Sequence, residues 1–215
     1  MDVPETVDTT NFAKFQTGNP LVRRLIDRFY DRLRSIVEPM DAASVLDAGC
    51  GEGETISRLD DLLPEPVFAV DILDESVAFT KRRLPFVEAS RQSIYQLPFA
   101  DDAFDLVLSL EVLEHLERPS NALGELNRVA RTDVVLSVPH EPYFRLGTLL
   151  RGKYLRGLGN HPEHLNHWNR RSLSAFLQSH LDVLEVAIAF PWLIAHCRPR
   201  SADCVRRAGP VQDRL

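Results

Sequence analysis

The stretch VLDAGCGEG, residues 45–53, decides the fold class of this chain. A short apolar run stops at a glycine, and two further glycines follow at alternate positions before a segment with helical spacing. Glycine lets the backbone approach a ligand closely, and the first turn of a following helix offers free backbone amides. The next apolar run ends at Asp71, where a carboxylate can accept hydrogen bonds from both hydroxyls of a ribose. Strand, glycine turn, helix, strand and acid in this order predict a nucleoside-binding site.

The segments on both sides of this turn alternate between two kinds of periodicity. Apolar residues at helical spacing predict helices over 20–37, from the glycine turn to about 63, and over 74–84, 119–129 and 171–180. Short apolar runs predict strands at 44–49, 67–72, 86–89, 104–109, 133–138, 183–189 and 192–197. We therefore expect an α/β, Rossmann-like fold, with a doubly wound, seven-stranded, mostly parallel sheet. Its last strand should be antiparallel, and helices should cover both faces.

Composition limits the classes of protein to which the chain can belong. The 215 residues are 44% hydrophobic and 26% charged, which is typical of a globular domain. The net charge of −6 argues against a nucleic-acid partner. No apolar run is long enough for a membrane span, and residues 1–10 lack the pattern of a signal peptide, so the expected location is the cytoplasm. Three cysteines with no metal-like spacing indicate neither a disulfide framework nor a zinc site.

We expect one domain over residues 1–215, existing as a monomer or a homodimer. Residues 1–40 should form an N-terminal helical lid, and residues 41–139 the cofactor-binding half. Residues 140–170 are rich in His, Pro, Gly, Arg and Asn, with a short helix expected at 143–150. Irregular segments of this length often serve as lids, so we predict that this one covers the acceptor. Residues 198–215 are expected to be a flexible tail.

Four motifs together resemble the class I S-adenosylmethionine-dependent methyltransferases of the type 11 or 12 kind. They are VLDAGCGEG (45–53), AVDI (69–72), SIYQLPFADDAFDLVLSLEVLEHL (93–116) and DVVLSVP (133–139). The resemblance covers about residues 40–195. It implies S-adenosylmethionine as the methyl donor and a small-molecule acceptor.

The resemblance also assigns a cofactor role to each matching position. Asp47 and the backbone of Gly49, Cys50 and Gly51 would hold the methionine end, and Asp71 would hold the ribose. Apolar contacts would come from Ile72 on the adenine, from Ile94 beside it and from Leu110 next to the methionine portion. Ser93 stands where many members of the family have an aspartate near the adenine amino group, and a serine can still accept a hydrogen bond.

A second constellation, EVLEHL at 111–116, follows the strand that should border the cofactor. In a helical turn, Glu111, Glu114 and His115 would share one face. Further on, HPEHLNHW at 161–168 supplies His164 and, as the second choice, His167 ahead of Trp168. This pattern resembles the metal-dependent O-methyltransferases of the ubiquinone pathway and of small-RNA 2′-O-methylation. It implies a divalent ion, such as Mg²⁺, held by Glu111, Glu114, His115 and His164.

Two other interpretations of this constellation stay open. His115 or His164 could be a general base without metal, since the ordinary pKa of histidine suits that role, or the motif could be structural. We expect Trp168 to anchor its loop in the core. On the resemblance around residues 111–115 alone, we favour O-methylation of a small molecule. The alternatives are an RNA 2′-O-methyltransferase and a non-catalytic, S-adenosylmethionine-binding regulatory protein.

Overall fold

The computed structural model describes residues 18–143 and 165–201. Most of the predicted acceptor lid and tail, the expected helix at 143–150 beyond its first residue, and the start of the predicted N-terminal lid lie outside the described residues. No helix in the described part of the chain is both long enough and apolar enough to cross a membrane.

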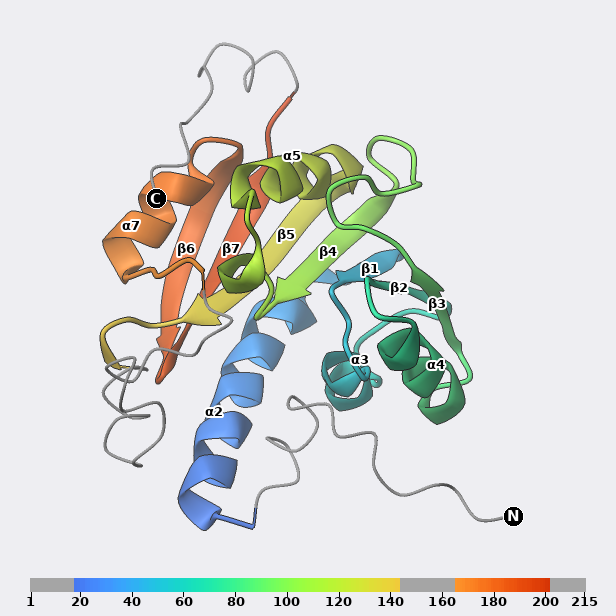
Figure 1. Ribbon diagram of the computed structural model, residues 1–215, viewed down its shortest axis with the longest axis horizontal. Coiled ribbons are helices and arrows are strands. Elements are labelled where there is room, and N and C mark those ends of the chain that lie inside the picture. Colours follow the sequence, from blue (N-terminus) through green and yellow to red (C-terminus); the bar gives the residue numbers. More distant parts are fainter. Residues whose placement is uncertain (1–17, 144–164, 202–215) are drawn as a thin grey trace.

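The described residues form one seven-stranded sheet with the order β3-β2-β1-β4-β5-β7-β6 (Figure 1). Strands β1 to β5 pair in parallel, and β7 is antiparallel to both of its neighbours, β5 and β6. The predicted fold, with its antiparallel last strand, is therefore confirmed. The bounds are β1 Val45–Ala48, β2 Val67–Asp71, β3 Val87–Arg91, β4 Phe104–Leu110, β5 Ala130–Pro139, β6 Leu181–Ala189 and β7 Trp192–Pro199.

Helices cover both faces of the sheet. They are α2 Pro20–Val37, α3 Glu54–Leu59, α4 Asp74–Arg83, α5 Pro119–Val129 and α7 Arg170–Leu177, with short 3₁₀ turns η1 Glu38–Met40 and η2 Leu113–His115. One core cluster joins α2, α3 and α4 to one face of the sheet, and a second joins α5 and α7 to the other (Figure 1). This division follows from right-handed crossovers, which place the helices of the two halves of the sheet on opposite sides.

Helix α2 shows how the local sequence sets an element. Asn19 caps it, since its side chain accepts hydrogen bonds from the amides of Leu21 (2.9 Å) and Val22 (3.4 Å). Pro20 stands at the first helical position, where a missing N–H costs nothing. The buried stripe at helical spacing faces the sheet and consists of Ile26, Phe29, Tyr30, Leu33, Ile36 and Val37.

Several predicted boundaries are wrong by a few residues: α7 ends at 177 and not at 180, and β5 begins at 130 and not at 133. Helix α3 ends at Leu59 and not near 63, because the amides of Leu62 and Leu63 both bond to the Leu59 carbonyl, which tightens the chain into a turn before Pro64. Strand β3 runs over 87–91 and not 86–89.

The strand order places a topological switch point between β1 and β4. The chain runs outward from β1 to β3 and then returns to start β4 on the other side of β1. Ligands of open α/β sheets bind at the carboxyl ends of the strands at such a point. The glycine turn after β1 and the Glu111 segment after β4 both lie there.

Candidate active site

The glycine turn after β1 is held against β2 by two backbone hydrogen bonds. The amides of Gly49 and Cys50 both donate to the carbonyl oxygen of Val70, at 2.8 and 3.0 Å. Gly49, Gly51 and Gly53 have φ angles of 91°, 50° and 73°, a region that L side chains rarely adopt. A Cβ atom at Gly51 would meet no heavy atom within 4 Å, so this part of the turn faces open space. The backbone is therefore accessible to a ligand at Gly51.

Asp47 lies in β1 directly below this turn. The residue is 2% exposed, and its Oδ2 atom has no hydrogen-bond partner among the described residues. Burial, with a smaller contribution from the charge of Asp71, raises the pKa of the Asp47 carboxyl to about 7. An unpaired buried oxygen is costly, and a cationic donor from a ligand would relieve that cost.

Asp71 ends β2 and turns its carboxylate toward the glycine turn. Its Oδ2 accepts a hydrogen bond from the amide of Gly51, and its Oδ1 accepts one from the amide of Leu73, both at 2.9 Å. A carboxylate has about four acceptor positions, so both oxygens can still accept from ligand hydroxyls. Ile72, the next residue, is 56% exposed and presents an apolar side chain beside this carboxylate.

Cys50 contributes to the turn through its backbone. Its side chain is buried, and burial raises the pKa of the thiol well above its usual range. The Sγ atom donates to the carbonyl of Gly51 at 3.6 Å. Burial therefore favours the protonated thiol, which is a weaker nucleophile than the thiolate.

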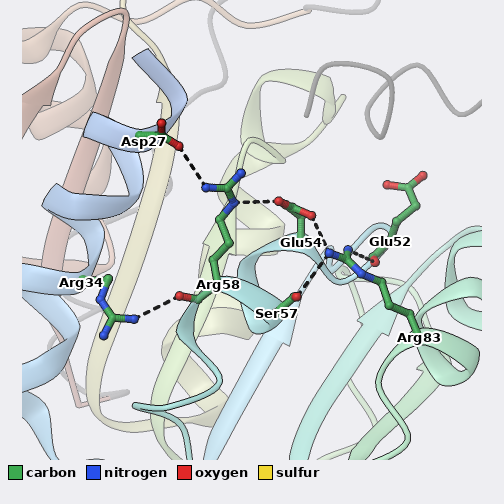
Figure 2. Close-up of polar contacts among 7 residues, drawn as sticks. All are labelled: Asp27, Arg34, Glu52, Glu54, Ser57, Arg58 and Arg83. Atoms are coloured by element: carbon green, nitrogen blue, oxygen red, sulfur yellow. Dashed lines mark hydrogen bonds and ion pairs between the residues drawn. The ribbon is translucent and has the colours of Figure 1, made fainter. Parts of the chain in front are cut away.

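Two arginines hold the glycine turn from opposite sides (Figure 2). Glu54, at the start of α3, accepts from Arg58 Nε at 2.7 Å and from Arg83 Nη2 at 2.9 Å. Arg83, on α4, also donates to the carbonyl of Glu52 inside the turn (3.3 Å), while Arg58 reaches Asp27 on α2 (3.3 Å). The turn is thus fixed to helices on both sides, which preorganises its amides.

The loop after β3 carries Ser93 and Ile94, both partly buried. The hydroxyl of Ser93 accepts a hydrogen bond from the amide two residues later at 3.3 Å. Arg128, on α5, donates to the carbonyl oxygens of Leu97 (2.9 Å) and Phe99 (2.7 Å). This arginine fixes the part of the loop that leads into β4.

The segment after β4 begins with a strained residue. Leu110 ends β4, and Glu111 has a φ angle of 58°, which is uncommon outside glycine. The amide of Glu111 donates to the carbonyl of Ser137 at 3.1 Å. Its carboxylate accepts from Ser137 Oγ (3.0 Å) and from Trp192 Nε1 (2.7 Å). Donors on β5 and β7 therefore fix the orientation of the Glu111 carboxylate.

The helical turn expected at 111–115 begins later than the sequence suggested. Only Leu113 to His115 form a 3₁₀ turn, and Glu111 lies outside it. The expectation that Glu111 shares a helical face with Glu114 and His115 is therefore wrong. Glu114 is 1% exposed and His115 is partly buried.

The segment that ends at Trp168 docks onto this turn. The amides of Leu165 and Asn166 donate to the carbonyl of Glu114 at 2.8 and 3.1 Å. The side-chain amide of Asn166 donates to the carbonyl oxygens of Leu113 (3.1 Å) and Leu116 (2.7 Å). Trp168 is buried, which confirms its predicted role as a core anchor.

His164 lies outside the described residues, although its neighbour at 165 contacts the turn. Among the residues that the structure describes, no group of three His, Cys, Asp or Glu side chains could hold a metal ion.

Sequence reasoning overlooked His140 and Asn166. His140 follows β5 directly and is 92% buried, as its exposed fraction is 8%. The signal was a histidine at the carboxyl end of a strand next to the switch point, a position that carries function in this class of sheet. Asn166 gave no such signal, because only its contacts with the 3₁₀ turn reveal it.

The residues at the switch point fit a nucleoside ligand that carries a cationic amine. Asp47 offers a buried oxygen with no partner in the described part of the chain, Gly51 leaves room for a ligand against the backbone, and Asp71 has acceptor positions for ribose hydroxyls. Ile72 supplies apolar surface on the same side.

Comparison with known proteins agrees with this description. Residues 46–138 match the family model described as a methyltransferase domain. A Probable S-adenosylmethionine-dependent methyltransferase of Mycobacterium tuberculosis is 30% identical over 174 residues, which are 80% of this chain and 59% of that protein. The chain thus spans less than two thirds of this relative. The malonyl-[acyl-carrier protein] O-methyltransferase of Halorhodospira halophila is 35% identical over 114 residues, 51% of this chain and 38% of that protein.

A solved structure shares the fold. Magnesium protoporphyrin IX methyltransferase from Synechocystis, crystallised with bound SAH, has a TM-score of 0.65 and 18% identity, covering 89% of this chain and 95% of that chain.

Proposed function

We propose that this chain, whose residues 46–138 match the family model of a methyltransferase domain, is a class I S-adenosylmethionine-dependent methyltransferase that transfers a methyl group to a small-molecule acceptor. The observation that carries the proposal is the constellation of Asp47, Gly51 and Asp71 at the switch point. An Asp47 oxygen with no partner among the described residues, open space at Gly51 and the Asp71 carboxylate that accepts from the Gly51 amide come together at the ends of the neighbouring strands β1 and β2.

Each residue of this constellation has a distinct part in holding the cofactor. Asp47 would pair with the ammonium group of the methionine end, since a positive charge stabilises the ionised carboxylate. Asp71 would accept hydrogen bonds from the ribose hydroxyls. Ile72 would cover one face of the adenine, and Ser93 would offer a polar contact at its edge. Leu110 would border the methionine end.

The sulfonium of the cofactor makes its methyl carbon electrophilic without help from the protein. The remaining tasks for the protein are to align the acceptor with the carbon–sulfur bond, to exclude water and, for a hydroxyl acceptor, to remove a proton. The fixed glycine turn on one side and the 3₁₀ turn at 113–115 on the other limit where the acceptor can lie.

We propose O-methylation, with His115 or His164 as the group that takes the proton. The docking of Leu165 and Asn166 on the carbonyl of Glu114 supports this, because it brings the end of the histidine-rich segment to the turn that carries His115. Among the relatives, the Halorhodospira protein is named as an O-methyltransferase.

A divalent ion held by Glu111, Glu114, His115 and His164 is a second proposal. Docking of residue 165 on the turn favours it. The contacts of Glu111 oppose it, because Ser137 and Trp192 already orient that carboxylate. The double variant Glu111→Ala with His164→Ala should remove any stimulation of activity by Mg²⁺ or Mn²⁺, and a retained metal response would exclude this set.

Calorimetric titration with S-adenosylhomocysteine tests the central proposal. Wild-type protein should bind it, and Asp71→Ala should lose most of the affinity. Asp74→Ala is the matched control, since Asp74 is an exposed acid three residues away that pairs only with Arg91 on the surface in the described structure (3.2 Å). Absence of binding by the wild type would overturn the proposal. Binding with no transfer to any acceptor would indicate a regulatory protein.

A further inference from the structure

His140 is fixed at the carboxyl end of β5 by its backbone. Its amide donates to the carbonyl of Pro191 at 2.9 Å, and the residue forms a β-bridge with Trp168. The amide of Glu141 donates to the carbonyl of Trp168, also at 2.9 Å. The backbone at His140 is thus held by the segments around Pro191 and Trp168. The ring nitrogens of the imidazole take no part in these contacts.

The imidazole of His140 is a buried polar group that the described residues leave partly unsatisfied. Its Nδ1 atom is buried and has no hydrogen-bond partner among the described residues. Burial lowers the pKa of the ring, which favours the neutral form with one donor and one acceptor nitrogen. Leaving such a group without a partner costs free energy, and sites that bind ligands commonly carry groups of this kind.

Aromatic side chains continue from His140 to the surface. The ring of Tyr143 packs edge-on against the imidazole, with 5.0 Å between the ring centroids. Phe190 packs against Tyr143 at 5.8 Å. Tyr143 and Phe190 are 47% and 51% exposed, although residues of this kind are usually buried. His140, Tyr143 and Phe190 form what we call the aromatic cluster.

The aromatic cluster lies beside the region where the methyl group would be delivered. Strand β5 is the neighbour of β4 on the side away from β1 and β2. The methionine end of the cofactor would lie over β1 and β4, so the next ligand along the sheet edge lies over β5 and β7. Trp192 connects the two regions, because it pairs with Pro139 in the β-ladder and donates to Glu111.

From this arrangement we propose that the aromatic cluster binds the acceptor, that the acceptor is an aromatic hydroxyl compound, and that His140 forms a hydrogen bond with its hydroxyl. Tyr143 and Phe190 offer ring edges and faces to a flat apolar ring. The imidazole supplies the polar group that distinguishes a phenol from a plain arene. This assignment rests on the proposed methyltransferase function, whose acceptor it describes.

The test uses two fluorinated probes of nearly equal size, 4-fluorophenol and fluorobenzene, with binding measured by ¹⁹F NMR. The full chain is titrated with and without S-adenosylhomocysteine. Wild-type protein should bind 4-fluorophenol about 3- to 10-fold more tightly than fluorobenzene, as expected for one hydrogen bond. His140→Phe should bind both probes equally and keep its affinity for S-adenosylhomocysteine. His140→Gln, which retains a donor and an acceptor, should restore part of the preference.

Two further variants separate apolar from polar contributions. Phe190→Ala should weaken the binding of both probes by the same factor. Leu184→Ala, at an exposed position on β6, should leave both affinities unchanged. Equal binding of the two probes by the wild type, or an unchanged preference in a folded His140→Phe, would overturn the assignment. Failure of the wild type to bind S-adenosylhomocysteine would instead refute the proposed function. The preference between the two probes would then show whether the phenol site exists independently of cofactor binding.

Discussion

Replacement of Asp47 by asparagine should stabilise the protein in the absence of cofactor. The Asp47 carboxyl has a pKa of about 7 in the folded chain, against an ordinary value of 3.8. The unfolded chain therefore releases this proton first, and stability is lost as the pH rises from about 4 to about 7. At ~1.36 kcal/mol for each unit, the shift of roughly three units corresponds to an upper bound of about 4 kcal/mol at pH 8. At pH 5 the loss of stability is about 2 kcal/mol, because the Asp47 carboxyl is protonated in most folded molecules at that pH.

Urea denaturation of the wild type and of Asp47→Asn at pH 5, 6, 7 and 8 measures this effect. The stability difference between the two proteins should grow by about 2 kcal/mol or more between pH 5 and pH 8. The cost of burying the new amide is the same at every pH and does not affect this increment. Parallel stability curves for the two proteins would refute the reasoning. The same variant should bind S-adenosylhomocysteine more weakly, since it loses the charge that would face the ammonium group.

Three other predictions follow from contacts around the site. Gly49→Ala should destabilise the fold more than Gly51→Ala, because its Cβ would lie 2.4 Å from Val112 Cγ2 whereas Gly51 faces open space; the order of the two urea midpoints checks this. Asn166→Ala should cost about 1–3 kcal/mol locally through the loss of two hydrogen bonds, seen as faster amide hydrogen exchange at 165–168. Arg128→Met should free the loop after β3 and weaken S-adenosylhomocysteine binding in a calorimetric titration.

The contrary outcomes are equally specific. Equal urea midpoints for the two glycine variants would show that Val112 yields without cost. Unchanged exchange at 165–168 would mean that the backbone bonds to Glu114 and the burial of Trp168 hold the segment without the Asn166 side chain. For Arg128→Met, Arg32→Met is the control, because Arg32 on α2 pairs with Glu185 on β6, at the opposite edge of the sheet from β3; equal affinities in the two variants would exclude a role for the loop in binding.

The fold could be predicted from the sequence because its signals are local. Asn19 and Pro20 begin a helix with one apolar stripe, and the run at 45–48 stops at a glycine whose φ angle is positive. The errors came where hydrogen bonding overrides apolar pattern. Leu62 and Leu63 continue the apolar spacing of α3, yet their amides bond to Leu59 in a tighter turn.

Only part of the candidate site could be predicted from the sequence. Asp47, Gly51 and Asp71 are linked by motif spacing, and the structure brings them together. Glu111 could not be placed in this way, since its orientation depends on Trp192, which lies 81 residues away in the chain. Its left-handed backbone follows from tertiary contacts that no local pattern encodes. For His140 the sequence offered only its place at the end of a strand, because burial without a partner among the described residues is a property of the packed chain.

The contact between Gly49 and Val112 has a consequence for how this sequence can change over generations. A Cβ atom at 49 would collide with the Val112 side chain, and Val112 stands between the strained Glu111 and the 3₁₀ turn. Substitutions in the glycine motif and in the segment after β4 are therefore not independent of each other. A smaller residue at 112 would remove the collision, while the φ angle of 91° would still disfavour any L residue at 49. Drift at these two positions should be ordered in time, with the change at 112 preceding the change at 49.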